Sequence, residues 1–124
     1  MKIGILEDQA AVSEMLTYAC ALEGHRVSAY PSVSTFLADV LAEYPTGRAF
    51  DALVVDLLLQ GACSGTEVIR YVKKFYPDLP VVLISAGSLA EIKTAVQELP
   101  TVTTLQKPFK IRSLLDVIEQ GEHG

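Results

Sequence analysis

Acidic residues follow two apolar segments of the chain. Glu7 and Asp8 come directly after the segment 2–6, and Asp56 comes directly after the run 52–55. Four consecutive apolar residues without alternation are typical of a strand buried on both faces of a parallel sheet. Open α/β sheets bind their ligands where the carboxyl ends of the strands meet. We therefore expect the three carboxylates to lie together at one edge of a sheet, although Asp8 could instead serve as an N-cap.

Two further polar residues follow predicted strands. Ser85 comes after the apolar segment 81–84, and Lys107 comes shortly after the segment 101–105. Three clustered carboxylates repel one another unless a cation compensates them. Mg²⁺ prefers oxygen ligands, and a carboxylate beside Mg²⁺ suits phosphoryl transfer. The Lys107 ammonium and the Ser85 hydroxyl could then bind two other phosphoryl oxygens.

The rest of the pattern describes five strands that alternate with five helices. Such alternation predicts a doubly wound α/β fold, with a parallel sheet between two helix layers. The second and fifth strands are the least apolar, so we expect them at the edges, in the spatial order 2-1-3-4-5. Ser64 with Glu67 and Ser88 with Glu91 are predicted capping boxes that start two of the helices. The expected strands are 2–6, 26–30, 52–55, 81–84 and 101–105.

Length and composition set further limits. The 124 residues are enough for one domain, which we place at 1–120, followed by a short polar tail or linker start at 121–124 without evident structure. The net charge of -5 argues against nucleic-acid binding. The absence of a membrane-length apolar run and of a signal-peptide pattern predicts a cytoplasmic protein. Cys20 and Cys63 form no metal or disulfide motif, so we expect free thiols.

Taken together, these residues resemble the receiver domain of two-component response regulators. The matching motifs are the acidic pair Glu7-Asp8, Asp56, Ser85-Ala86 and Lys107-Pro108, each after the appropriate strand. Each motif alone is common, whereas four of them in this order are specific. The resemblance covers essentially residues 1–120 and implies the flavodoxin-like (βα)5 fold, with a parallel sheet of order 2-1-3-4-5.

The resemblance implies a role for each acidic residue. Asp56 is then the phosphoacceptor, taking a phosphoryl group from a phosphohistidine of a sensor histidine kinase or phosphotransfer protein. Asp8 and Asp56 ligate Mg²⁺ directly, while Glu7 acts through water. The backbone carbonyl of Leu58 is a further metal ligand. The family implies a signalling domain that catalyses only its own phosphorylation and dephosphorylation, rather than an enzyme.

The resemblance also implies a switching mechanism. Ser85 binds a phosphoryl oxygen. Lys107 pairs with Asp56 and later with the phosphoryl group, and the family has a cis peptide bond between this lysine and Pro108. Phosphorylation then changes the face made by the fourth helix, fifth strand and fifth helix, which contacts an output domain or target, with a homodimer possible. The candidate positions on that face are Lys93, Gln97, Thr104, Arg112 and Asp116.

The chain departs from the family pattern at several positions. Gln60 stands where the family usually has proline, and Gly65 lies nine rather than eight residues after Asp56. Thr104 replaces the usual aromatic residue, so the hydroxyl-plus-ring coupling of the family cannot operate in its usual form. Ser85 replaces the commoner threonine and keeps the hydroxyl.

Two alternative functions remain open from the sequence. A degenerate receiver would bind partners constitutively, as Thr104 and the altered loop would allow. A phosphohydrolase of the haloacid dehalogenase type would need a second aspartate where Leu58 stands, and a cap for which the chain has no room. Leu58 and Gly87 occupy the positions that tune loss of the phosphoryl group, and neither side chain can hold an attacking water. We therefore expect slow dephosphorylation.

Overall fold

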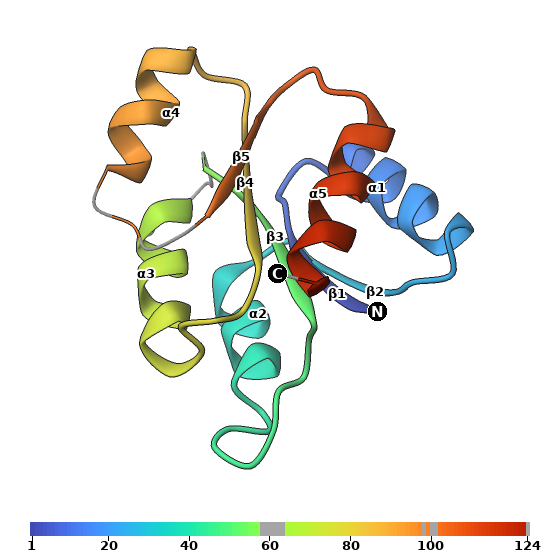
Figure 1. Cartoon of the computed structure of the whole chain (residues 1–124), viewed down its shortest axis with the longest axis vertical. Helices are drawn as coiled ribbons and strands as arrows, with labels where there is room; N and C mark the ends of the chain where they lie inside the picture. Colours follow the sequence, from blue (N-terminus) through green and yellow to red (C-terminus); the bar gives the residue numbers. More distant parts are fainter. Residues whose placement is uncertain (58–63, 98, 100–101, 124) are drawn as a thin grey trace.

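The chain folds as an alternation of strands and helices. The computed structural model describes residues 1–57, 64–97, 99 and 102–123 (Figure 1). The strands are β1 (Lys2–Leu6), β2 (Arg26–Tyr30), β3 (Ala52–Asp56), β4 (Val81–Ser85) and β5 (Thr103–Gln106). The helices are α1 (Ala10–Leu22), α2 (Val33–Val40), α3 (Gly65–Phe75), α4 (Leu89–Val96) and α5 (Ile111–His123).

The described strands form one parallel sheet in the order β2-β1-β3-β4-β5. This confirms the fold class and the strand order that the sequence predicts. The register pairs Leu6 with Val55 across β1 and β3, and Ser85 with Gln106 across β4 and β5. Because the strands point the same way, the residues that follow them share one edge of the sheet.

Alternation along the strands divides the core into two layers. In β3, Ala52 and Val54 pack under α1 and α5, whereas Leu53 and Val55 pack under α2 and α3. Figure 1 shows the same division, with α1 and α5 on one side of the sheet and α2, α3 and α4 on the other. The sheet is therefore covered on both faces, which explains why its central strands are apolar without a break.

Burial distinguishes the central strands from the edges. Every residue of β3 and β4 is buried, including the terminal Asp56 and Ser85. In β2 and β5, by contrast, no residue is fully buried. The edge positions predicted for the two weaker strands are confirmed.

The serine side chains of both predicted capping boxes cap their helices. Ser64 Oγ accepts a hydrogen bond from the Glu67 backbone N–H at 3.3 Å, at the start of α3. Ser88 Oγ accepts from the Glu91 N–H at 3.1 Å, at the start of α4. These bonds satisfy N–H groups that have no partner within the helix.

Some predicted boundaries need correction. β3 ends at Asp56 and β4 at Ser85, each one residue later than expected, and β5 begins at Thr103 rather than at residue 101. β5 ends at Gln106 rather than at residue 105, because pairing with β4 continues to Ser85. α5 continues to His123, so residues 121–123 are helical rather than part of an unstructured tail. Glycine weakens a helix by about 1 kcal/mol without ending it. The altered loop from Gln60 to Cys63 lies outside the described residues.

A membrane-crossing helix is not found among the described residues, since none of their helices is both long and apolar enough.

Candidate functional site

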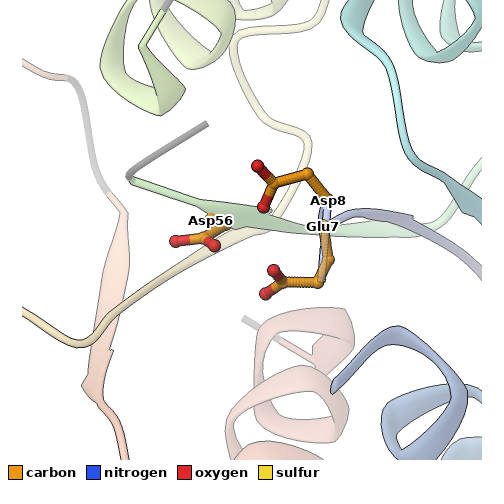
Figure 2. A group of neighbouring side chains, drawn as sticks. All are labelled: Glu7, Asp8 and Asp56. Atoms are coloured by element: carbon orange, nitrogen blue, oxygen red, sulfur yellow. The ribbon is translucent and has the colours of Figure 1, made fainter. Parts of the chain in front are cut away.

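The structure brings the three predicted acids together. One carboxylate oxygen from each of Glu7, Asp8 and Asp56 lies within 4.8 Å of the others. Figure 2 shows these carboxyl groups converging from the ends of β1 and β3. Glu7 and Asp56 are only 1% and 4% exposed, whereas Asp8 is half-buried. Buried charges at this separation need positive partners.

Lys107, which follows the edge strand β5, provides one of those partners. Its Nζ lies 3.0 Å from Glu7 Oε2 and 3.4 Å from Asp56 Oδ2, and its side chain is 16% exposed. Burial lowers the pKa of Lys107, but the hydrogen bond to Glu7 and the charges of Asp56 and Glu7 outweigh it, so the pKa is raised. Burial raises the pKa of Glu7, which Lys107 offsets only in part. The ammonium therefore stays charged between the two carboxylates.

The donor set fits a divalent cation. Three carboxylates against the single Lys107 ammonium leave two negative charges, which one Mg²⁺ would balance. All three acids offer oxygen, the ligand type that Mg²⁺ requires. Asp8 and Asp56 would hold the ion directly, and Glu7 would hold it through water. The carbonyl of Leu58, the fourth predicted ligand, lies outside the described residues.

Backbone hydrogen bonds at the strand ends orient the acids. The Glu7 N–H donates to the Tyr30 carbonyl at 3.1 Å, which extends the pairing with β2 by one residue. Glu7 Oε1 accepts from the Gln9 N–H at 3.1 Å. The N-cap of α1 is Gln9, which makes no side-chain capping bond, so the alternative role of Asp8 as the N-cap is wrong. The Asp8 carboxylate lies beside that of Asp56.

Gly65 supports the segment that carries Asp56. Its N–H donates to the Leu57 carbonyl at 3.0 Å. A Cβ at Gly65 would lie 2.8 Å from the Leu57 Cα and still closer to the carbonyl oxygen of Asp56, a distance that real Cβ atoms do not reach. Only glycine permits this approach. Gly65 therefore reaches the site despite its nine-residue spacing from Asp56.

Ser85 is the last residue of β4, directly before the adjoining turn. Its side chain is buried, and its Oγ accepts a hydrogen bond from the Gly87 N–H at 3.0 Å. The Lys107 N–H donates to the Ser85 carbonyl at 2.6 Å, which joins the turn to the residue after β5. The sequence reasoning missed Gln106, whose Nε2 donates to the Gly87 carbonyl at 2.9 Å. Its only signal was its place between a strand and the site lysine.

The predicted switching face is built around β5. Thr104 is half-buried and pairs in register with Leu83. Arg112 Nε lies 2.9 Å from Asp116 Oδ1 on α5. The Lys107–Pro108 peptide bond is cis, as the resemblance implies. The remaining candidate positions on this face, Lys93 and Gln97 of the α4 region, are exposed.

Comparison with known proteins identifies the family. The sequence model of the response regulator receiver domain family matches residues 3–119. The response regulator FleR of Pseudomonas aeruginosa is 29% identical over 123 residues, which are 99% of this chain and 25% of FleR. The transcriptional regulator NtrC of Azospirillum brasilense is 27% identical over 117 residues, 94% of this chain and 23% of NtrC. The chain thus spans about a quarter of the length of these relatives.

Solved structures agree with the family match. NtrX from Brucella abortus superposes with a TM-score of 0.84 at 26% identity, covering 98% of this chain and 27% of NtrX. The BeF3-activated receiver domain of DrrB superposes with a TM-score of 0.83 at 24% identity, covering 99% and 97% of the two chains, and supports the fold alone. With the family model matched over nearly all of its length, the chain belongs to the response regulator receiver domains of two-component systems.

Proposed function

We propose that this domain accepts a phosphoryl group on Asp56 in a Mg²⁺-dependent reaction, with a histidine kinase or a phosphotransfer protein as the donor. The observation that carries the proposal is the buried cluster of Glu7, Asp8 and Asp56, with Lys107 bound between two of the acids. Burying such a cluster costs stability, and that cost is expected where function requires the cluster. Its position at the carboxyl edge of a parallel sheet is where this architecture binds ligands.

The geometry supports a definite role for each group. An oxygen of the Asp56 carboxylate attacks the phosphorus, the phosphorus–nitrogen bond of the donor breaks, and the imidazole nitrogen leaves with the electron pair. Bound Mg²⁺ supplies charge neutralisation for the transferred group. Asp8 and Asp56 would hold the ion directly and Glu7 would hold it through water. Lys107, 3.4 Å from Asp56 Oδ2, pairs with a phosphoryl oxygen after transfer.

Ser85 completes the proposed site. Its hydroxyl already accepts from Gly87, which leaves the hydroxyl proton available for a phosphoryl oxygen. The side chain at position 87 is a hydrogen atom, and Leu58 is apolar, so neither residue orients a water for hydrolysis. We therefore expect an acyl phosphate that is slow to hydrolyse.

The output of the switch is proposed from the relatives. FleR and NtrC are about four times as long as the part that this chain matches, and NtrC is named a DNA-binding transcriptional regulator. By analogy, phosphorylation alters the face of α4, β5 and α5, which binds an output domain, a target protein or a second copy of the domain. We place this function in the cytoplasm, where a kinase would supply the phosphoryl group.

Intact-mass spectrometry tests the proposal. The protein is incubated with acetyl phosphate in Mg²⁺ or in EDTA, alongside an Asp56→Ala variant. We expect one phosphoryl adduct, formed only with Mg²⁺ and only when Asp56 is present. A folded wild-type protein that binds Mg²⁺ and forms no adduct would support constitutive partner binding by a degenerate receiver instead.

A further inference from the structure

A short chain of hydrogen bonds connects β5 to the Ser85 hydroxyl. Gln106 Nε2 donates to the Gly87 carbonyl at 2.9 Å, and the Gly87 N–H donates to Ser85 Oγ at 3.0 Å. The turn is also closely packed, because a Cβ at Gly87 would lie 3.2 Å from Ser85 Oγ and 2.6 Å from Glu91 Oε2. Gly87 is thus held on both sides, by Gln106 at its carbonyl and by Ser85 at its N–H.

Strand register explains why Gln106 performs this contact. Gln106 is the register partner of Ser85, so its side chain begins beside the turn that follows β4. Adjacent residues on a strand point to opposite faces of the sheet. Lys107, the next residue, reaches Glu7 and Asp56, while Gln106 reaches the Gly87 carbonyl. The last residue of β5 and the residue that follows it therefore contact the two sides of the site.

We infer that Gln106 is a positioning residue for the phosphoryl group, acting through Gly87 to hold the Ser85 hydroxyl ready to donate to it. This inference rests on the proposed function. A serine hydroxyl rotates freely unless a partner restricts it, and a fixed donor costs less entropy when the ligand arrives. Thr104 carries no ring that could cover or restrain this turn, which leaves Gln106 as a polar link from β5.

The test uses beryllofluoride with Mg²⁺ as a phosphoryl analogue, titrated by calorimetry. Gln106→Met keeps the length of the side chain and removes its donor. We expect this variant to bind beryllofluoride about 2- to 10-fold more weakly than the wild type, the usual effect of one hydrogen bond. The matched control is Thr103→Ala, a change at an exposed residue at the other end of β5, with unchanged affinity expected. Unchanged or tighter binding by Gln106→Met would overturn the inference.

A double-mutant cycle separates positioning from general loosening of the strand. In a Ser85→Ala background, Gln106→Met should leave beryllofluoride affinity unchanged, because the hydroxyl on which it acts is gone. Persistence of the full effect in that background would contradict a route through Ser85. Hydrogen exchange at the Gly87 amide gives a readout without metal or analogue. Exchange should be faster in Gln106→Met, and an unchanged rate would equally overturn the inference.

The same titration distinguishes failure of this inference from failure of the proposed function. A wild-type protein that binds no beryllofluoride in Mg²⁺ would contradict phosphoryl acceptance itself, and the role of Gln106 would fall with it. A wild-type protein that binds the analogue, beside a Gln106→Met variant that binds it equally well, would leave the proposed function standing and remove only Gln106.

Discussion

The two sides of the site are stabilised in different ways. The acidic side consists of Glu7, Asp8 and Asp56, with Lys107 between two of the acids. The turn side consists of residues 85–87 and Gln106, and its contacts are hydrogen bonds between neutral groups. The acidic side carries excess negative charge, whereas the turn side needs no ion.

This difference separates binding from alignment. Charge at the acidic side can provide affinity for a cation and a phosphoryl group, because interactions between buried charges are strong. Neutral hydrogen bonds contribute about 1 kcal/mol each, enough to orient a hydroxyl and too little to hold a phosphoryl group alone. Substitutions on the acidic side should therefore have larger effects than those on the turn side.

The largest expected effect comes from the backbone beneath the acidic side. Gly65→Ala would place a methyl group 2.8 Å from the Leu57 Cα, so α3 or the segment with Asp56 must move. We expect a loss of about 3 kcal/mol in the free energy of unfolding, measured with urea. Gly47→Ala is the control, since its Cβ would meet nothing closer than 3.9 Å. Equal stability of the two variants would contradict the close approach described for Gly65.

The next effect concerns Lys107, which among the described residues is the only cationic side chain between the acids. Lys107→Met should lower the free energy of unfolding by about 2 kcal/mol without Mg²⁺, because it leaves Glu7 and Asp56 facing each other. Saturating Mg²⁺ should reduce this loss, since the ion restores positive charge. Urea unfolding with and without Mg²⁺ measures both values, with the exposed Lys110→Met as the control. A loss that Mg²⁺ does not reduce would argue against a shared electrostatic role.

A Mg²⁺ titration compares the two sides directly. Asp8→Asn removes a charged ligand and should weaken Mg²⁺ binding by at least about tenfold, measured by calorimetry. Ser85→Ala, on the turn side, should change it less than about twofold. Asp51→Asn controls for loss of a charge elsewhere, since Asp51 binds the Lys2 backbone N–H at 2.8 Å. Equal weakening by Asp8→Asn and Ser85→Ala would remove the distinction between the two sides.

The smallest effect lies in the core beneath α1 and provides a reference for alkaline titrations. Burial raises the pKa of Cys20 from 9.0 to about 11. The unfolded chain therefore loses the Cys20 proton at a lower pH than the folded protein. The contribution of the buried thiol to stability is complete below pH 9 and is lost as the pH rises to 11. Between pH 8 and pH 10 the wild type should lose roughly 1 kcal/mol more than Cys20→Ala in urea unfolding. Parallel pH profiles would contradict this pKa shift.

Apolar patterning was sufficient to predict the parts of the molecule that depend on burial. The uninterrupted apolar run in β3 is a consequence of helices on both faces of the sheet, so it also located Asp56 at the strand end. The strand order then brought Glu7, Asp8 and Lys107 to the same edge. These residues could be predicted because topology alone places them together.

Features that depend on single long-range contacts could not be predicted in this way. Gln106 matters through its register with Ser85 and through a contact to Gly87, 19 residues away, and a polar residue at a strand end carries no pattern that signals either. Gly65 has the wrong spacing for the family, and only the backbone approach to Leu57 reveals its role. The continuation of α5 through Gly121 was missed because glycine resembles a stop signal in sequence.

Locating the phosphoryl group tests the central claim most directly. The protein is treated with acetyl phosphate and Mg²⁺, and the acyl phosphate is then reduced with borohydride to an alcohol. Peptide mass spectrometry should find homoserine at position 56 and unmodified Glu7 and Asp8, with no conversion in EDTA. Reduction at another acid, or none at position 56 in a folded protein that binds Mg²⁺, would contradict Asp56 as the phosphoacceptor.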